Sequence, residues 1–274
     1  MIQIAMKRSI VLHVLLFIPF LAAVCTNAEE WVSFEGITET GGKLQLAGIL
    51  SVPQGGGPFP AVVMLCGCGG LKDKNDSRQQ AAWAQRLLSW GYVSLRLDSF
   101  GSRNYDNICN DLDSVRPSAI AYDAYSARSY LAGLQFVDPE NIAVIGWSHG
   151  GTAVLTIVDG LYRDEGVNPF RAAIAFYPWC RYMEIFDTPL LMLVGDNDDT
   201  CPASRCETLK SSKEVKKSSA EFKLIIYPGA HHSFDFEGLK GDFYGHHAEY
   251  NPQAAADAIQ QTRDFLARYL GEAQ

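Results

Sequence analysis

The sequence has little positive charge. Its 274 residues include 23 Lys and Arg against 31 Asp and Glu, for a net charge of -8 at pH 7. Because an acidic surface repels phosphate groups and anionic lipid headgroups, we predict no nucleic-acid partner. The sequence also lacks internal repeats and the paired Cys-x-x-Cys segments of a zinc module. A chain of this length that is 47% hydrophobic can bury one sizeable core, which favours a single large α/β domain.

The N-terminus has the layout of a signal peptide. Lys7 and Arg8 precede an apolar run over residues 10–24, and a stretch of small residues follows up to Ala28. The run is short for a spanning helix, so we predict cleavage after Ala28, export to the periplasm or medium, and no stable membrane span. A lipid anchor on Cys25 is the alternative, although Val24 is bulky for the position before a lipidated cysteine.

Cleavage leaves an even set of cysteines in residues 29–274, in an oxidising compartment that favours disulfides. They are Cys66, Cys68, Cys109, Cys180, Cys201 and Cys206. Six cysteines allow 15 connectivities, so the pairing stays open. The spacing of Cys66 and Cys68 is too short for a bond between them, and we expect each to pair elsewhere.

The pattern of apolar runs predicts the fold of residues 29–274. Two strands joined around Gly41 form an edge hairpin, and apolar runs then alternate with segments of helical period. Such alternation indicates parallel strands covered on both faces, a doubly wound α/β domain. The predicted strands span residues 31–34, 44–52, 61–65, 92–97, 142–146, 172–177, 190–194 and 222–227, the helices 78–90, 118–134, 150–161 and 254–270, and the polar stretch 210–219 is a helix end or surface loop.

One strand runs into a helix through Gly-x-Ser-x-Gly, from Gly146 to Gly150. This context is typical of a nucleophile elbow, in which Ser148 sits on a strained turn above the sheet. An ordinary helix-capping serine is the alternative. The helix N-terminus would also favour the negative charge that develops on an attacked carbonyl oxygen, which makes the amide of His149 a candidate oxyanion donor.

Two later strand ends carry the groups that a serine nucleophile needs. Asp196, Asp198 and Asp199 follow one strand, and the adjacent His231 and His232 follow the next. The order nucleophile, acid, histidine is that of α/β-hydrolases. The residues alone do not separate the three acids or the two histidines.

A glycine-rich loop follows the first central strand, at residues 66–70. In this fold the second oxyanion donor comes from that loop, and the amide of Cys68 is the candidate.

The sequence resembles the dienelactone hydrolase family over nearly all of residues 29–274. The matching segments are residues 67–71, 98–101 and 146–151, Gly195-x-x-Asp198-x-x-x-Pro202, and Tyr227-Pro228-Gly229-Ala230-x-His232-x-Phe234. The resemblance implies an α/β-hydrolase fold with Asp198 as the acid and His232 as the base. Two positions differ, since family members often have histidine at Cys66 and the founding enzymes use cysteine at Ser148. Dienelactone is therefore a doubtful substrate.

Several other residues have a structural and a functional interpretation. Phe100, Trp147, Tyr177 and Trp179 lie near strand ends and either line an acyl pocket or fill the core. Asp98 and Arg103 contact substrate or form a loop salt bridge. A catalytic thiol at Cys66 or Cys68 is less favoured than disulfide use. A metal site from His231, His246, His247, Asp235 and Asp242 is less favoured than polar loops, because no helix-spaced ligand pair occurs.

The sequence therefore predicts a serine hydrolase that cleaves small carboxylic esters or lactones through an acyl-enzyme, without cofactor or metal. A peptidase or amidase on the same scaffold is the enzymatic alternative, and a binding protein without turnover is the other. The oligomeric state stays open.

Overall fold

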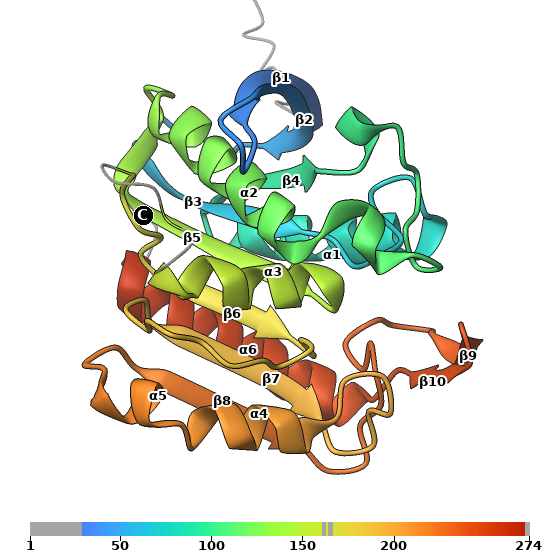
Figure 1. Ribbon diagram of the computed structural model, residues 1–274. Helices are drawn as coiled ribbons and strands as arrows, with labels where there is room; N and C mark the ends of the chain where they lie inside the picture. The colour runs from blue at the N-terminus through green and yellow to red at the C-terminus, as the bar shows by residue number, and fades with distance from the viewer. Residues whose placement is uncertain (1–28, 161–162, 164–166, 272–274) are drawn as a thin grey trace, which may run out of the picture.

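The computed structural model describes residues 29–160, 163 and 167–271, and its centre is an eight-stranded sheet. The strand order is β1-β2-β4-β3-β5-β6-β7-β8 (Figure 1). The β1–β2 and β2–β4 pairs are antiparallel and the other pairs are parallel. The strands are β1 (Glu29–Ile37), β2 (Lys43–Ser51), β3 (Phe59–Leu65), β4 (Val93–Asp98), β5 (Val137–Trp147), β6 (Ala173–Phe176), β7 (Leu190–Gly195) and β8 (Phe222–Tyr227).

Helices cover both faces of this sheet, as the sequence predicts. The strand β3 shows why, since Val63 and Leu65 face one core cluster while Val62 and Met64 face the other. The first cluster packs under α2 (Pro117–Ala132) and α3 (His149–Val158), and the second under α1 (Lys74–Ser89) and α6 (Pro252–Leu270). Figure 1 shows α2 and α3 in front of the sheet and α6 behind it. The predicted α/β-hydrolase architecture and its edge hairpin are confirmed.

The structure contains several short elements that the sequence does not predict. The polar stretch 210–219 contains a short helix, α5 (Lys213–Lys217), which follows α4 (Ala203–Lys210). A separate hairpin of β9 (Lys240–Phe243) and β10 (His246–Glu249) projects beside the carboxyl end of the sheet (Figure 1). Two 3-10 helices, η1 (Gly101–Arg103) and η2 (Leu112–Val115), lie in the connection between β4 and α2.

Two disulfides join segments that follow the strands of the sheet, and one of their cysteines, Cys206, lies in α4. Cys68 pairs with Cys109, and Cys180 pairs with Cys206. Cys66 and Cys201 are free and buried. The prediction that Cys66 pairs elsewhere is therefore wrong, because its side chain is packed in the core under α2 and α3.

The predicted signal peptide, residues 1–28 with Cys25, lies outside the described residues. Among the residues that are described, no helix is both long and apolar enough to span a membrane.

Candidate active site

Ser148 lies on the turn between β5 and α3. Its backbone has φ 51° and ψ -114°, a left-handed conformation that is strained for a residue with a side chain. The turn is held by hydrogen bonds from the Ser148 amide to the Phe176 carbonyl (3.0 Å) and from the Thr152 amide to the Ser148 carbonyl (2.8 Å). This turn conformation places the hydroxyl above the sheet, next to the N-terminus of α3.

Both glycines of the elbow are required by close backbone approaches. A Cβ on Gly146 would lie 2.4 Å from the Gly150 carbonyl oxygen, and a Cβ on Gly150 would lie 2.4 Å from the carbonyl oxygens of Leu65 and Cys66. Since each neighbour is backbone, it cannot rotate away. The spacing Gly-x-Ser-x-Gly is therefore a packing requirement of this turn.

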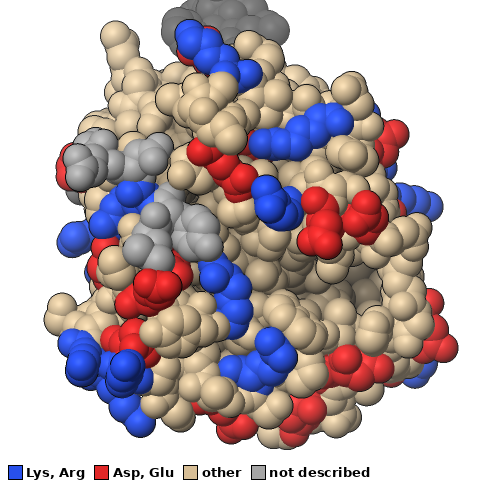
Figure 2. Space-filling view, viewed as in Figure 1, with Lys and Arg blue, Asp and Glu red and all other residues tan. Residues whose placement is uncertain are grey.

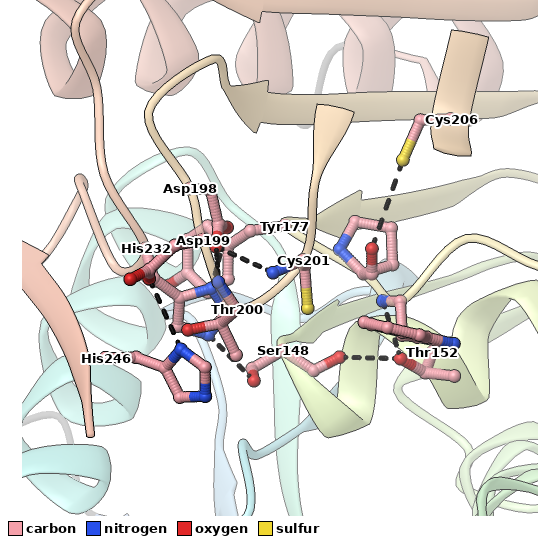
Figure 3. A network of polar contacts seen from close by, with 12 residues as sticks. Ser148, Thr152, Tyr177, Asp198, Asp199, Thr200, Cys201, Cys206, His232 and His246 are labelled. Atoms are coloured by element: carbon pink, nitrogen blue, oxygen red, sulfur yellow. Dashed lines mark hydrogen bonds and ion pairs between the residues drawn. The ribbon is translucent and has the colours of Figure 1, made fainter. Parts of the chain in front are cut away.

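The structure connects Ser148, His232 and Asp198 through one imidazole (Figure 3). His232 Nε2 lies 2.9 Å from Ser148 Oγ, and His232 Nδ1 lies 2.7 Å from Asp198 Oδ2. Asp198 is buried in the loop after β7, and its Oδ1 accepts hydrogen bonds from the amides of Thr200 (2.9 Å) and Cys201 (2.7 Å). The carboxylate is thus fixed on one oxygen and free to orient the imidazole with the other.

The neighbouring acids and the second histidine have other partners. Asp196 accepts a hydrogen bond from the Gly229 amide (2.6 Å), and Asp199 lies 3.4 Å from His246 Nδ1. His231 packs its ring against His247. None of these three side chains takes part in the contacts that join Ser148, His232 and Asp198.

The loop that carries the Cys68 amide is tied down at several points. The Gly69 amide donates to Asp76 Oδ2 (2.9 Å), and the Ile108 amide donates to the Cys68 carbonyl (2.9 Å). The Cys68–Cys109 disulfide adds a covalent tie to the same segment. Cys68 and His149 both line the cavity above Ser148, and their roles as oxyanion donors stay predictions.

The His149 side chain points away from the chemistry that its amide would serve. It is buried, and its Nε2 lies 2.8 Å from the Val115 carbonyl oxygen. Burial lowers the pKa of this imidazole, so the ring stays neutral and anchors η2 to the start of α3.

A cavity of about 650 Å³ opens over Ser148. Figure 2 shows the surface hollowed on the right, on the side where β9 and β10 lie in Figure 1. Its lining comes from the Cys68 loop, α1, the segment between β4 and α2, the start of α3, the loops after β6, β7 and β8, and the β9–β10 hairpin. The polar lining includes Asp73, Asp76 and Asp113, and among the described residues that line the cavity none is Lys or Arg.

Asp76 lies in the cavity wall formed by α1, and its pKa is raised. Burial raises its pKa to about 6 and the nearby Asp73 adds to the shift, while the hydrogen bond from the Gly69 amide opposes it. Asp73 caps α1 by accepting from the amides of Asn75 and Asp76. The wall therefore gains negative charge as the pH rises through about 6.

Residues 46–270 match the dienelactone hydrolase family. The chain belongs to this family. As a member it is a carboxylic ester hydrolase.

Individual relatives are distant and cover most of the chain. A protein of Synechocystis sp. with the provisional name carboxymethylenebutenolidase is 23% identical over 83% of this chain and 93% of its own length. A provisionally assigned dienelactone hydrolase from Klebsiella pneumoniae has a TM-score of 0.66 at 20% identity, covering 88% of this chain and all of its own. An esterase from Thermogutta terrifontis, solved with propionate bound, has a TM-score of 0.63 at 18% identity, covering 89% and 96%.

Most of the aromatic residues predicted as pocket lining are core residues in this family member. Trp179 lines the cavity, with the Arg205 guanidinium 4.1 Å from its ring centre. Phe100, Trp147 and Tyr177 are each 1% exposed and pack in the two core clusters. A position near a strand end does not tell whether a side chain turns into the core or toward the cavity, and for these three residues the core alternative holds.

The alternatives for Asp98 and Arg103 are also decided. Arg103 pairs with the buried Asp123 through two hydrogen bonds of 2.7 and 3.0 Å. Asp98 accepts from the amides of Phe100 (3.2 Å) and Gly101 (2.8 Å). Both have structural roles, Asp98 at the end of β4 and Arg103 in the connection that follows it.

A catalytic thiol finds no support at either cysteine of the glycine-rich loop. Cys68 is in a disulfide, and burial together with Asp76 and Asp98 raises the pKa of Cys66 well above its usual range.

Two groups of side chains in the described residues could hold a metal ion. Asp198, Cys201 and His232 form one, but His232 is already engaged on both nitrogens and burial raises the pKa of the Cys201 thiol. His231, His247 and Glu249 form the other. The wider set considered from the sequence is not brought together, because Asp235 is buried and His246 lines the cavity.

Asp235 belongs to a buried network that sequence reasoning missed. Its carboxylate accepts hydrogen bonds from Gln79 (2.9 Å), Tyr177 (2.7 Å), Trp83 (2.7 Å) and Trp147 (3.1 Å). Burial raises its pKa. Asp235 lies three residues after His232, and the network fixes this segment to α1, β5 and the end of β6. No local sequence signal marks it, since its donors are far apart in the chain.

Proposed function

We propose that this protein hydrolyses uncharged or cationic carboxylic esters, lactones included, through an acyl-enzyme on Ser148. The observation that carries the proposal is the continuous contact from Asp198 through His232 to the strained Ser148 at the mouth of a cavity. Acyl transfer by a serine requires a nucleophile, a base and an acid that are each within hydrogen-bond distance of the next group.

The reaction follows from these contacts. Ser148 Oγ attacks the ester carbonyl carbon while its proton passes to His232 Nε2, 2.9 Å away. The tetrahedral intermediate collapses, and the imidazolium gives the proton to the departing alcohol. Water then attacks the acyl-enzyme with His232 as base, and Ser148 is released with its proton. Asp198 holds the imidazole in the tautomer with hydrogen on Nδ1.

The oxyanion is assigned to the amides of Cys68 and His149. The His149 amide lies at the N-terminus of α3, where the helix dipole favours negative charge. The Cys68 amide lies in a segment fixed by the Cys68–Cys109 disulfide and by the hydrogen bond between Gly69 and Asp76. Donors held in advance stabilise the developing charge without reorganisation.

The negative charge of the cavity lining supports the proposed class of uncharged or cationic substrates. The name of the Synechocystis relative refers to a butenolide with a carboxymethylene group, which is an anion at neutral pH. Asp73, Asp76 and Asp113 line the cavity here without a lysine or arginine among its described lining residues. Bringing a carboxylate beside them costs Coulomb energy that no opposite charge offsets. Anionic lactones are therefore poor substrates for this chain.

Hydrolysis of matched p-nitrophenyl esters by the purified protein tests the proposal. The expected result is turnover of neutral esters, loss of turnover in Ser148→Ala with unchanged circular dichroism, and slow turnover of an ester whose acyl chain ends in a carboxylate. Anilides of the same acids compare amidase activity. Full activity of Ser148→Ala would rule out the serine mechanism, and a preference for the anionic ester would rule out the substrate class.

A further inference from the structure

The β9–β10 hairpin has two faces with different surroundings. Phe243, His246 and Ala248 line the cavity. In the antiparallel register His247 lies opposite Asp242, and Glu249 lies opposite Lys240. Because side chains alternate along a strand, these four residues share the face that points away from the cavity. Their chemistry is therefore separate from the site over Ser148.

His231 packs on this outer face. Its ring lies 4.6 Å from the ring of His247, in an edge-to-face arrangement at 78°. The Nδ1 atom of His231 is buried and has no hydrogen-bond partner within the described part of the chain. The ring is thus held by its packing against His247. A ligand that binds Nδ1 would not have to break an existing hydrogen bond.

His247 is arranged as metal-binding histidines are. Its Nε2 lies 3.0 Å from Glu249 Oε2, and its Nδ1 lies 3.1 Å from Asp242 Oδ1. A histidine that binds a metal through one nitrogen commonly donates the other N–H to a carboxylate. Asp242 is in position to accept it, while Glu249 is in position to share the metal. Lys240 contacts the other carboxylate oxygen of Glu249, Oε1, at 2.8 Å.

We infer that His231, His247 and Glu249 form a binding site for a divalent metal ion of the zinc type, with Asp242 orienting His247. The three ligand atoms lie within 4.8 Å of one another, and small side-chain rotations bring them to the roughly 3.3 Å edges of a tetrahedral zinc site. Two imidazoles and one carboxylate leave the fourth position to water.

Bound metal would connect the hairpin to the loop after β8. His231 precedes His232, and His232 forms an isolated parallel bridge with Ala248 of β10. The ion would add a coordination tie beside this bridge, with His231 on one segment and His247 and Glu249 on the other. The hairpin wall of the cavity would then be fixed to the segment that carries His232. The site itself is independent of the proposed esterase function.

Protons compete with the metal at this site. Because the metal binds neutral imidazole, affinity for zinc should fall as the pH is lowered.

Isothermal titration of chelator-treated protein with Zn²⁺ tests the site without reference to activity. We expect one equivalent to bind, and affinity to fall at least tenfold in both His247→Gln and Glu249→Gln. Asp242→Asn, which removes the orienting carboxylate, should weaken binding about tenfold. His246→Gln changes the neighbouring residue on the cavity face and is the matched control, expected to bind as the parent does.

Cys201→Ala removes a member of the other possible ligand group and should also leave zinc affinity unchanged. Far-ultraviolet circular dichroism establishes that each variant is folded. The inference is overturned if the parent protein binds no zinc at millimolar concentration, if His247→Gln and Glu249→Gln bind as tightly as the parent, or if Cys201→Ala alone abolishes binding.

Discussion

Removing the Cys68–Cys109 disulfide should reduce turnover more than removing the Cys180–Cys206 disulfide, although both changes should cost similar stability. The two bonds close loops between cysteines 41 and 26 residues apart. The chain-entropy relation, which depends on the logarithm of loop length, gives losses of about 4 and about 3.5 kcal/mol. The second pair is therefore a matched control for destabilisation.

The difference in turnover comes from what each bond holds. Cys68 carries the proposed oxyanion amide, and its disulfide ties that segment to Cys109 on the cavity wall. Full loss of one oxyanion donor costs about 10²–10³ in kcat. The segment keeps its hydrogen bonds from Gly69 to Asp76 and from Ile108 to Cys68, so we expect a smaller loss, about tenfold.

The assay compares kcat for a neutral p-nitrophenyl ester in the double variants Cys68→Ser/Cys109→Ser and Cys180→Ser/Cys206→Ser. Denaturant unfolding of both proteins measures the stability losses, and the assay temperature is set below both melting transitions. The reasoning is refuted if the first variant keeps kcat within twofold of the parent, or if the control loses as much.

Three further outcomes follow from the site. Asp198→Asn should keep the fold and lower kcat by about 10⁴, because the imidazole loses its orienting carboxylate; near-parent kcat would contradict the geometry. Gly150→Ala should lower the free energy of unfolding by about 3 kcal/mol or more, since its Cβ meets backbone at 2.4 Å, whereas Gly56→Ala, with open space around it, should not. In the parent, the kcat/KM ratio of a cationic ester to its neutral isostere should rise as the pH passes about 6 and Asp76 ionises. Asp76→Asn should lower that ratio several-fold at neutral pH and flatten its pH profile, and an unchanged ratio would remove Asp76 from substrate selection.

The fold could be predicted because its signals are local. The apolar run in β3 and the glycines around Ser148 reflect constraints within a few residues, namely burial on both faces and close backbone contact. Strand ends also place Asp198 and His232 at one edge of the sheet. Which acid and which histidine meet depends on loop geometry, and that distinction came from the family resemblance.

The remaining features have no recognisable signal in the local sequence. Asp73 and Asp76 have the sequence pattern of a helix cap and first turn, and nothing in it shows that the same residues face a cavity. The hairpin strands β9 and β10 have the polar sequences Lys-Gly-Asp-Phe and His-His-Ala-Glu, without the apolar alternation by which strands are recognised. Tyr177 has φ 37° at the end of β6, and its hydroxyl reaches Asp235 inside the core, an arrangement that no strand pattern predicts.

Covalent labelling of Ser148 tests the central claim most directly. The purified protein is treated with a fluorophosphonate, digested and mapped by mass spectrometry, beside Ser148→Ala and a denatured sample. The account predicts one adduct on Ser148, formed in the native protein and absent from both controls. No adduct on the native protein, or an adduct on a different residue that persists in Ser148→Ala, would contradict it.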